Sequence, residues 1–194
     1  TGISWTEVEI APNVDATIGG GGTVIDTTGS ITLLGLHNRD IGSLNPLTTV
    51  WSVPVEFTAT IESKNFDVNR GARAYAEAPG IGAFVASGTI AVATSDADVD
   101  TRVEAGATLR AGGDVAVGAH TVNEAHVRAQ AQAFSGVSLG ATEAFAYSTG
   151  STKARLNGNV QSALGGPAAA SVSVTAKSLD IVEAEARTTN GSLG

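Results

Sequence analysis

The chain has 194 residues, of which 42% are hydrophobic and only 5% aromatic, with 24 glycines and a formal net charge of −8. The apolar content excludes a disordered chain, and the absence of cysteine excludes disulfides, thiolate metal sites and cysteine nucleophiles. The acidic charge argues against nucleic acid or an anionic membrane surface as a partner. No apolar run approaches the ~18 residues of a transmembrane helix.

Residues 1–70 are interpreted as a divergent N-terminal β segment with a longer loop at 37–49. The glycines at 19–22 predict a turn, because no Gly-Lys-Ser/Thr of a phosphate loop follows them. Trp5 and Trp51 could form a sugar-stacking platform, but capping or core filling is the favoured interpretation in a chain with so few aromatic residues. The segment 1–70 is therefore a candidate for coils that cap the following repeats.

Internal repeats extend over 71–194. Arg73 and Arg128 each open an alternating Ala-rich run, and these runs define the spacing of the repeat. Other matches, such as Val103 with Leu156 and Val115 with Val172, have a slightly shorter or longer spacing. Drift of this size is expected where turns differ in length. The sequence predicts a repeat of about 55 residues, and we expect 71–194 to be part of a longer array.

The best-preserved copy spans 103–119, where short apolar runs are separated by Gly106 and by the pair at 112–113. Glycines at such breaks favour sharp turns. A related pattern occurs near the N-terminus, with Ile18 in the place of Val103 and Ile31 in the place of Val115.

Nearly every run alternates with period two. In 125–133 the odd positions are Ala or Val and the even positions are polar, which is typical of a strand with one buried face. Alanine favours helices, but the interleaved polar residues and the flanking Gly, Thr and Val favour strands. A repeat of several strands fits a propeller blade or a β-solenoid. A propeller needs four or more copies, whereas small inward residues suit a narrow solenoid, so we predict an all-β solenoid with glycines at its corners.

Residues 106–119, GATLRAGGDVAVGA, resemble the repeats of large bacterial secreted adhesins of the filamentous haemagglutinin and leukotoxin-like type. Those repeats share the pattern G-A-x-[VL]-x-A-G-G-D-V-x-V-x-A, followed by Ala-rich alternating strands, here at 125–133 and 141–147. The resemblance covers 71–190 and extends to 1–70 only at short Gly-containing segments. It implies a right-handed parallel β-helix, export to the surface of Gram-negative bacteria, and a role in adhesion, aggregation or biofilm matrix. It implies no catalytic residues.

Three aspartates, Asp96, Asp98 and Asp100, alternate with apolar residues and should share one face of a strand. Such carboxylates could bind Ca²⁺ or serve as acid and base in polysaccharide cleavage. The EF-hand pattern fails, because Thr101 and Arg102 follow. The favoured interpretation is a solvated outer face, partly neutralised by Arg102, that deters edge pairing, with calcium as the candidate cofactor.

A second polar row alternates with Ala and Val and is expected to point outward as an exposed binding face. Its members are Glu124, His126, Arg128, Gln130 and Gln132. His126 and His120 could form only a weak metal site without a third ligand, so exposed, outward histidines are the expectation.

Residues 136–140 match G-x-S-x-G, the nucleophile elbow of hydrolases. That motif needs a strand before it, a helix after it and a later histidine. The residues after it predict a strand, and His37, His120 and His126 all precede Ser138. Ser138 is therefore interpreted as an ordinary strand or corner residue.

Together these features predict a non-catalytic, surface-exposed or secreted adhesin-like structural module with a multivalent binding face. Its partner would be a host or neighbouring-cell surface or a glycan, and its location extracellular or at the bacterial cell surface. The alternative is a self-assembling extracellular filament subunit that associates through unpaired strand edges. A polysaccharide-active β-helix enzyme is a third hypothesis. We expect neither nucleic-acid binding nor membrane insertion.

Overall fold

The computed structural model describes residues 2–39, 50–52, 65–67 and 71–191, and these residues form strands and turns without a helix. The strands are β1 (Gly2–Ile10), β2 (Asn13–Ile18), β3 (Val24–Thr27), β4 (Ile31–His37), β5 (Val50–Ser52), β6 (Asn65–Asp67), β7 (Ala72–Ile81), β8 (Phe84–Asp96), β9 (Asp98–Val103), β10 (Thr108–Ala111), β11 (Val115–Phe134), β12 (Val137–Thr149), β13 (Thr152–Leu156), β14 (Asn159–Ser162) and β15 (Val172–Gly191).

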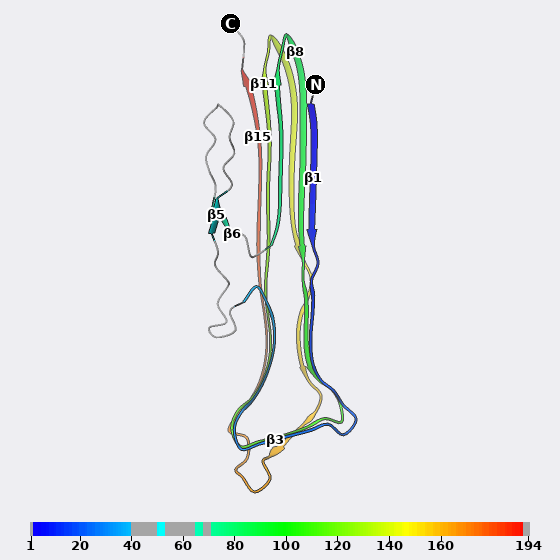
Figure 1. The fold of residues 1–194 in the computed structure, drawn as a ribbon, viewed down its shortest axis with the longest axis vertical. Coiled ribbons are helices and arrows are strands. Elements are labelled where there is room, and N and C mark those ends of the chain that lie inside the picture. The colour runs from blue at the N-terminus through cyan, green and yellow to red at the C-terminus, as the bar shows by residue number, and fades with distance from the viewer. Residues whose placement is uncertain (1, 40–49, 53–64, 68–70, 192–194) are drawn as a thin grey trace.

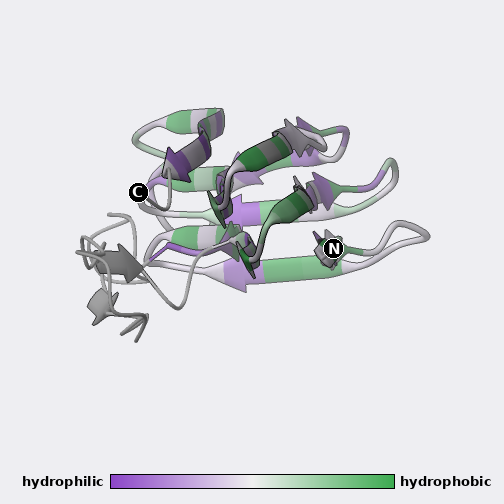
Figure 2. Ribbon diagram, turned by 90° about the horizontal axis from the view of Figure 1, so that it is seen from above, coloured by the Kyte–Doolittle hydropathy of each residue, from purple (hydrophilic) through white to green (hydrophobic). Residues whose placement is uncertain are grey.

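The chain passes three times through the same set of parallel sheets. Sheet A has the order β1-β8-β12, sheet B β2-β9-β13 and sheet C β3-β10-β14. In sheet D, β11 pairs with β15 on one side and with β4 and β7 on the other. Each pass runs along sheets A and B, crosses at sheet C and returns along sheet D (Figure 1). Viewed at right angles, the passes lie as levels one above another (Figure 2). The predicted all-β class is confirmed, and the strands of sheets A to D are parallel.

The space between sheets A and D is filled mainly by alanine. One buried cluster joins both walls and consists of Ala72, Ala74, Ala76, Ala91, Ala93, Ala125, Val127 and Ala129. Strand pairing stacks small residues on small residues: Ala76 pairs with Ala129, which pairs with Ala186. The alternation predicted for 125–133 is confirmed, because Ala and Val side chains of this segment belong to the core. Tertiary burial here overrides the intrinsic preference of alanine for helices.

Larger aliphatic residues fill the end of the core near sheet C. The second cluster contains Ile31, Val103, Ala107, Leu109, Ala111, Val115 and Val117. The corners beside it need glycine. Gly106 has a φ of +87°, and a Cβ at Gly112 would lie 2.4 Å from the backbone oxygen of Thr28 on the preceding pass. The predicted role of these glycines as corners is confirmed.

The register of the passes agrees with part of the predicted repeat. Val103 pairs with Leu156 and Val115 with Val172, as predicted. The predicted match of Arg73 with Arg128 is wrong, because Arg73 pairs with His126, which precedes Arg128 by one period of the alternation. Such a shift keeps every side chain on the same face, so an Ala-rich alternating run fixes the face but not the register.

Sheet D is interrupted in the first pass. The segment 38–71 lies between β4 and β7, where β11 continues unbroken through 122–124. Asn38 Nδ2 donates to the backbone oxygen of Val122 at 3.0 Å, and within the segment β5 and β6 pair antiparallel. Residues 2–37 thus belong to the same sheets as 71–191, and the division at residue 70 stays a prediction. Most of the predicted loop at 37–49 lies outside the described residues.

Candidate binding surface

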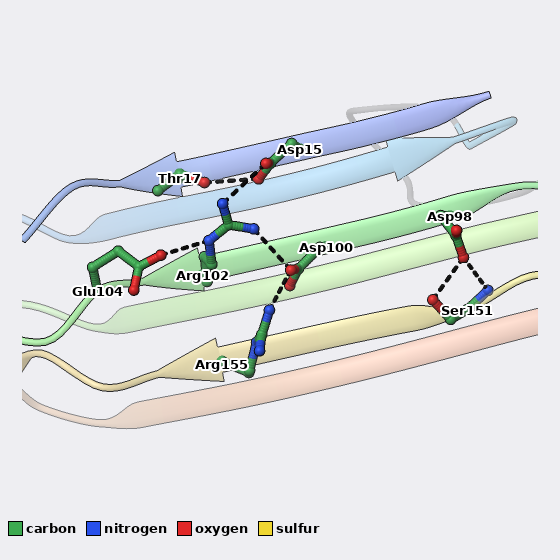
Figure 3. A network of polar contacts seen from close by, with 8 residues as sticks. All are labelled: Asp15, Thr17, Asp98, Asp100, Arg102, Glu104, Ser151 and Arg155. Carbon is green, nitrogen blue, oxygen red and sulfur yellow. Dashed lines mark hydrogen bonds and ion pairs between the residues drawn. The ribbon is translucent and has the colours of Figure 1, made fainter.

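The predicted carboxylate row lies on the outer side of sheets A and B. Asp96 ends β8. Asp98 and Asp100 follow on β9 with the same alternation (Figure 3). Asp98 accepts hydrogen bonds from the backbone nitrogen of Ser151 at 2.8 Å and from its Oγ at 2.7 Å. These hydrogen bonds lower the pKa of Asp98. The Asp98 carboxylate therefore fixes the start of β13 on the next pass.

Arg102 is the centre of an ionic network that crosses all three passes (Figure 3). Its guanidinium donates to Glu104 at 2.6 Å, to Asp100 at 2.8 Å and to Asp15 of the first pass at 3.0 Å. Arg155 of the third pass also donates to Asp100. The hydrogen bonds to Glu104 and Asp100 raise the pKa of Arg102. Alternating charges thus connect neighbouring passes on this face.

Asp15 belongs to the same network. A hydrogen bond from Thr17 and the nearby charge of Arg102 lower the pKa of the Asp15 carboxyl group. In the described part of the chain, no group of three or more His, Cys, Asp or Glu side chains is placed to hold a metal ion. Asp98 and Asp100 face protein donors, and calcium at Asp96, Asp98 and Asp100 stays a prediction.

The second predicted face, on β11, points away from the alanine core but is not exposed. Glu124, Arg128, Gln130 and Gln132 are 4%, 6%, 4% and 7% exposed. Arg128 pairs in register with Tyr75 on β7 and with Glu185 on β15. The predicted exposure of these four side chains is therefore wrong.

The histidines of β11 are enclosed in the same way. His126 contacts Glu124 through Nε2 and lies 3.2 Å from Glu183 through Nδ1, with its side chain 11% exposed. His120 is 5% exposed, and burial lowers its pKa, helped by the charges of Lys177 and Arg39. The expectation of exposed histidines is wrong for both His120 and His126.

The G-x-S-x-G segment starts at a turn and enters a strand. Gly136 precedes β12, and the backbone of Ser138 lies within this strand, paired with Val85 of β8. The strand predicted after the motif is confirmed, so the strand–turn–helix context of a nucleophile elbow is not formed.

The surface that sequence reasoning did not select is the outer face of sheet A. We use this name for the outward residues of three strands: Ile3, Trp5, Glu7 and Glu9 on β1; Phe84, Ala86, Gly88, Ile90, Val92 and Thr94 on β8; and Val137, Leu139, Ala141, Glu143, Phe145 and Tyr147 on β12. Several of its apolar side chains are highly exposed, with Ile3 at 88%, Phe84 at 80% and Leu139 at 72%. A contiguous exposed apolar patch is a typical interaction surface.

Trp5 belongs to this outer face. It is 67% exposed, so core filling is wrong for Trp5, and capping stays a prediction. The side chain of Trp51 lies outside the described residues. The alternation of β1 contained the signal, because Trp5 has the parity of Glu7 and Glu9 and the opposite parity to Val8 and Ile10, which pack against the core.

The strand register arranges aromatic and acidic residues in rows across this face. Trp5 pairs with Ile90, which pairs with Glu143. The next two rows are Glu7-Val92-Phe145 and Glu9-Thr94-Tyr147. In each row one outer strand carries a ring and the other carries a carboxylate, and the backbones of these two strands are about 9.6 Å apart by the usual strand spacing. The planes of Phe145 and Tyr147 are within 2° of parallel, with ring centroids 6.4 Å apart.

An apolar pocket adjoins these rows. It has a volume of about 440 Å³ and is lined by Ile3, Ala86, Ser87, Gly88, Leu139, Gly140 and Ala141. A smaller pocket of about 170 Å³ continues beside it, lined by Phe84, Val85, Ala86, Val137 and Leu139. The pocket forms because small residues such as Ala86 and Gly88 lie at its centre, while the larger side chains of Ile3 and Leu139 lie at its sides.

No protein family, curated protein or solved structure matches the chain. In the ranges that the structure describes, no helix has the length and apolar character needed to cross a membrane.

Proposed function

We propose that the chain forms coils of a right-handed parallel β-helix and acts as a non-catalytic, adhesin-like structural module. The parallel, stacked passes with an alanine interior support the β-helix, and the resemblance of residues 106–119 to adhesin repeats supports the biological role and the handedness. On this proposal the chain works outside the cell or at the bacterial surface, and its partner is a host or neighbouring-cell surface or a glycan.

The observation that carries the binding role is the exposed outer face of sheet A. It presents Trp5, Phe84, Leu139 and Tyr147 on regular strands that are stacked in register. A face repeated along stacked coils suits many weak contacts that add through multivalency. The contacts of Asp98 and Asp100 with Ser151, Arg102 and Arg155 favour a structural role for these carboxylates over an acid–base pair.

A bead assay tests the proposal. Beads coated with the purified chain at increasing density are incubated with bacterial and epithelial cells, and retained beads are counted. We expect retention to rise steeply with density, while the free monomer competes only weakly. Absence of retention on every cell type at the highest density would contradict an adhesive function.

A filament subunit is the second candidate, because the third pass has an open edge. Strand β15 pairs with β11 on one side only, and its core-facing residues Val172, Val174 and Val182 are 51%, 46% and 54% exposed. Stacking of a further coil from another copy would cover them. Concentration-dependent fibres in electron micrographs would support this alternative, and a strictly monomeric chain would exclude it. Turnover of acidic glycans that Asp98→Asn abolishes would instead support the enzyme hypothesis.

A further inference from the structure

Resting on the binding role proposed above, we propose that the outer face of sheet A binds a polysaccharide whose sugars carry amino groups. Trp5, Phe145 and Tyr147 stack on the apolar faces of the pyranose rings, and Glu7, Glu9 and Glu143 accept hydrogen bonds from hydroxyl and ammonium groups. The face is thus specific for basic glycans and rejects acidic ones.

The distribution of aromatic residues supports ring stacking. The chain has two Trp, two Tyr and five Phe, and the outer face of sheet A presents Trp5, Phe84, Phe145 and Tyr147 to solvent. Aromatic side chains otherwise bury large apolar areas in cores. Their exposure here, in a protein whose core is built from alanine and valine, indicates a ligand that uses their flat surfaces.

The rows supply a polar partner for each ring. In three successive rows, Trp5 is opposite Glu143, Glu7 is opposite Phe145 and Glu9 is opposite Tyr147. A pyranose has an apolar C–H face and a polar edge, so a sugar over β8 can contact a ring on one side and a carboxylate on the other. The adjoining pocket of about 440 Å³ is of the size that holds small ligands and leaves space for one end of the glycan.

The charge of the face selects the class of glycan. Among the outward residues that the structure describes on β1, β8 and β12, the acidic residues Glu7, Glu9, Glu143 and Asp96 occur without any Lys, Arg or His. An acidic polysaccharide would meet like charge, whereas ammonium groups are complementary. A second copy packed face to face would also bring carboxylates toward carboxylates, so self-association through this face is disfavoured.

The test measures binding of three β-1,4-linked oligosaccharides of similar length by calorimetry: glucosamine, N-acetylglucosamine and galacturonic acid oligomers. We expect the glucosamine oligomer to bind best, the N-acetylated oligomer more weakly and the acidic oligomer not at all. Affinity for glucosamine should fall as NaCl rises from about 50 to about 500 mM, because exposed charges are screened. Preference for the acidic oligomer, or no binding of any of the three, would overturn the inference.

Variants of the face distinguish stacking of an aromatic ring on a sugar from a general apolar contact. Trp5→Leu keeps an apolar side chain without a ring and should weaken binding about tenfold, the scale of a central aromatic anchor, whereas Trp5→Phe should retain most of it. Glu143→Gln should weaken binding of the glucosamine oligomer more than binding of the N-acetylated one. Leu164→Ala, an exposed apolar site outside this face, is the control. Equal binding by Trp5→Leu and Trp5→Phe would exclude ring stacking.

A lysine-rich peptide tests a basic protein as the partner. If the peptide binds the outer face of sheet A and no glucosamine oligomer does, the partner is a protein and the inference fails. Failure of the glycan assignment can be distinguished from failure of the proposed adhesive function. Retention of beads on cells without any oligosaccharide binding would leave the adhesive function standing while the glycan assignment falls.

Discussion

The outer faces of sheets A and B are built on the same three passes, yet their chemistry is opposite. On sheet B, Arg102 pairs with Asp15 of the preceding pass and Arg155 pairs with Asp100 of the preceding pass. On sheet A, the outward carboxylates of Glu7 and Glu143 are accompanied by exposed rings and by no described basic residue. The parallel stack therefore leaves the outward residues free to vary: those of sheet B connect the passes through ion pairs, and several apolar side chains of sheet A are exposed to solvent.

The largest effect on stability is expected from a substitution in the interior that lies behind both faces. Leu109 is 1% exposed and packs in the cluster with Val103 and Val115. Leu109→Ala should lower the free energy of unfolding by about 2–5 kcal/mol, because the cavity adds to the lost burial. Urea unfolding followed by circular dichroism measures it, with the exposed Leu164→Ala as the control. A loss equal to that of the control would show that Leu109 is not in the common core.

The ionic network of sheet B should contribute the next largest effect. Arg102→Met removes the charge that Glu104, Asp100 and Asp15 share but keeps a long apolar stem. We expect a lower Tm, with a smaller change than for Leu109→Ala, and a difference from wild type that shrinks at high salt. Arg187→Met on β15 makes the same substitution at an exposed position outside this face and should change Tm less. Equal changes of Tm in the two variants would show that the loss comes from removing a positive charge in general and not from breaking the network around Arg102.

Acid should weaken sheet B through Asp98. Its pKa is lowered in the folded protein by hydrogen bonds from Ser151. The stabilisation is therefore present above the ordinary pKa of 3.8 and is lost as the pH falls below it toward the folded-state value. Thermal unfolding from about pH 6 to about pH 3 should show a shallower loss of Tm for Asp98→Asn than for wild type.

A second variant checks the origin of this pH dependence. Ser151→Ala removes the Oγ donor that lies 2.7 Å from the Asp98 carboxylate. It should also reduce the slope of Tm against pH, by less than Asp98→Asn, because the backbone nitrogen of residue 151 still donates. A wild-type slope in both variants would contradict the assigned cause.

Local patterns in the sequence predict the sheets but not which faces are exposed. Alternation in 125–133 identifies the inward Ala and Val residues, and Gly106 and Gly112 mark corners, since both features depend on neighbours in the chain. The burial of Gln130, on the outward side of β11, cannot be obtained from this alternation. The rows of the outer face of sheet A join residues of β1, β8 and β12 that are distant in sequence. An Ala-rich alternating pattern looks the same after a shift of two residues, so it cannot assign the register of the strands that form these rows.

The smallest effect on stability is expected where the effect on binding is largest. Trp5 is 67% exposed, so Trp5→Ala removes only about 80 Å² of buried surface and should lower the free energy of unfolding by less than about 2 kcal/mol. The same urea titration as for Leu109→Ala measures it, with Val8→Ala on the inward side of β1 as the matched comparison. We expect Val8→Ala to be clearly more destabilising. If Trp5→Ala costs as much as Val8→Ala, the ring is holding the sheet together, and it is then not free to stack on a ligand.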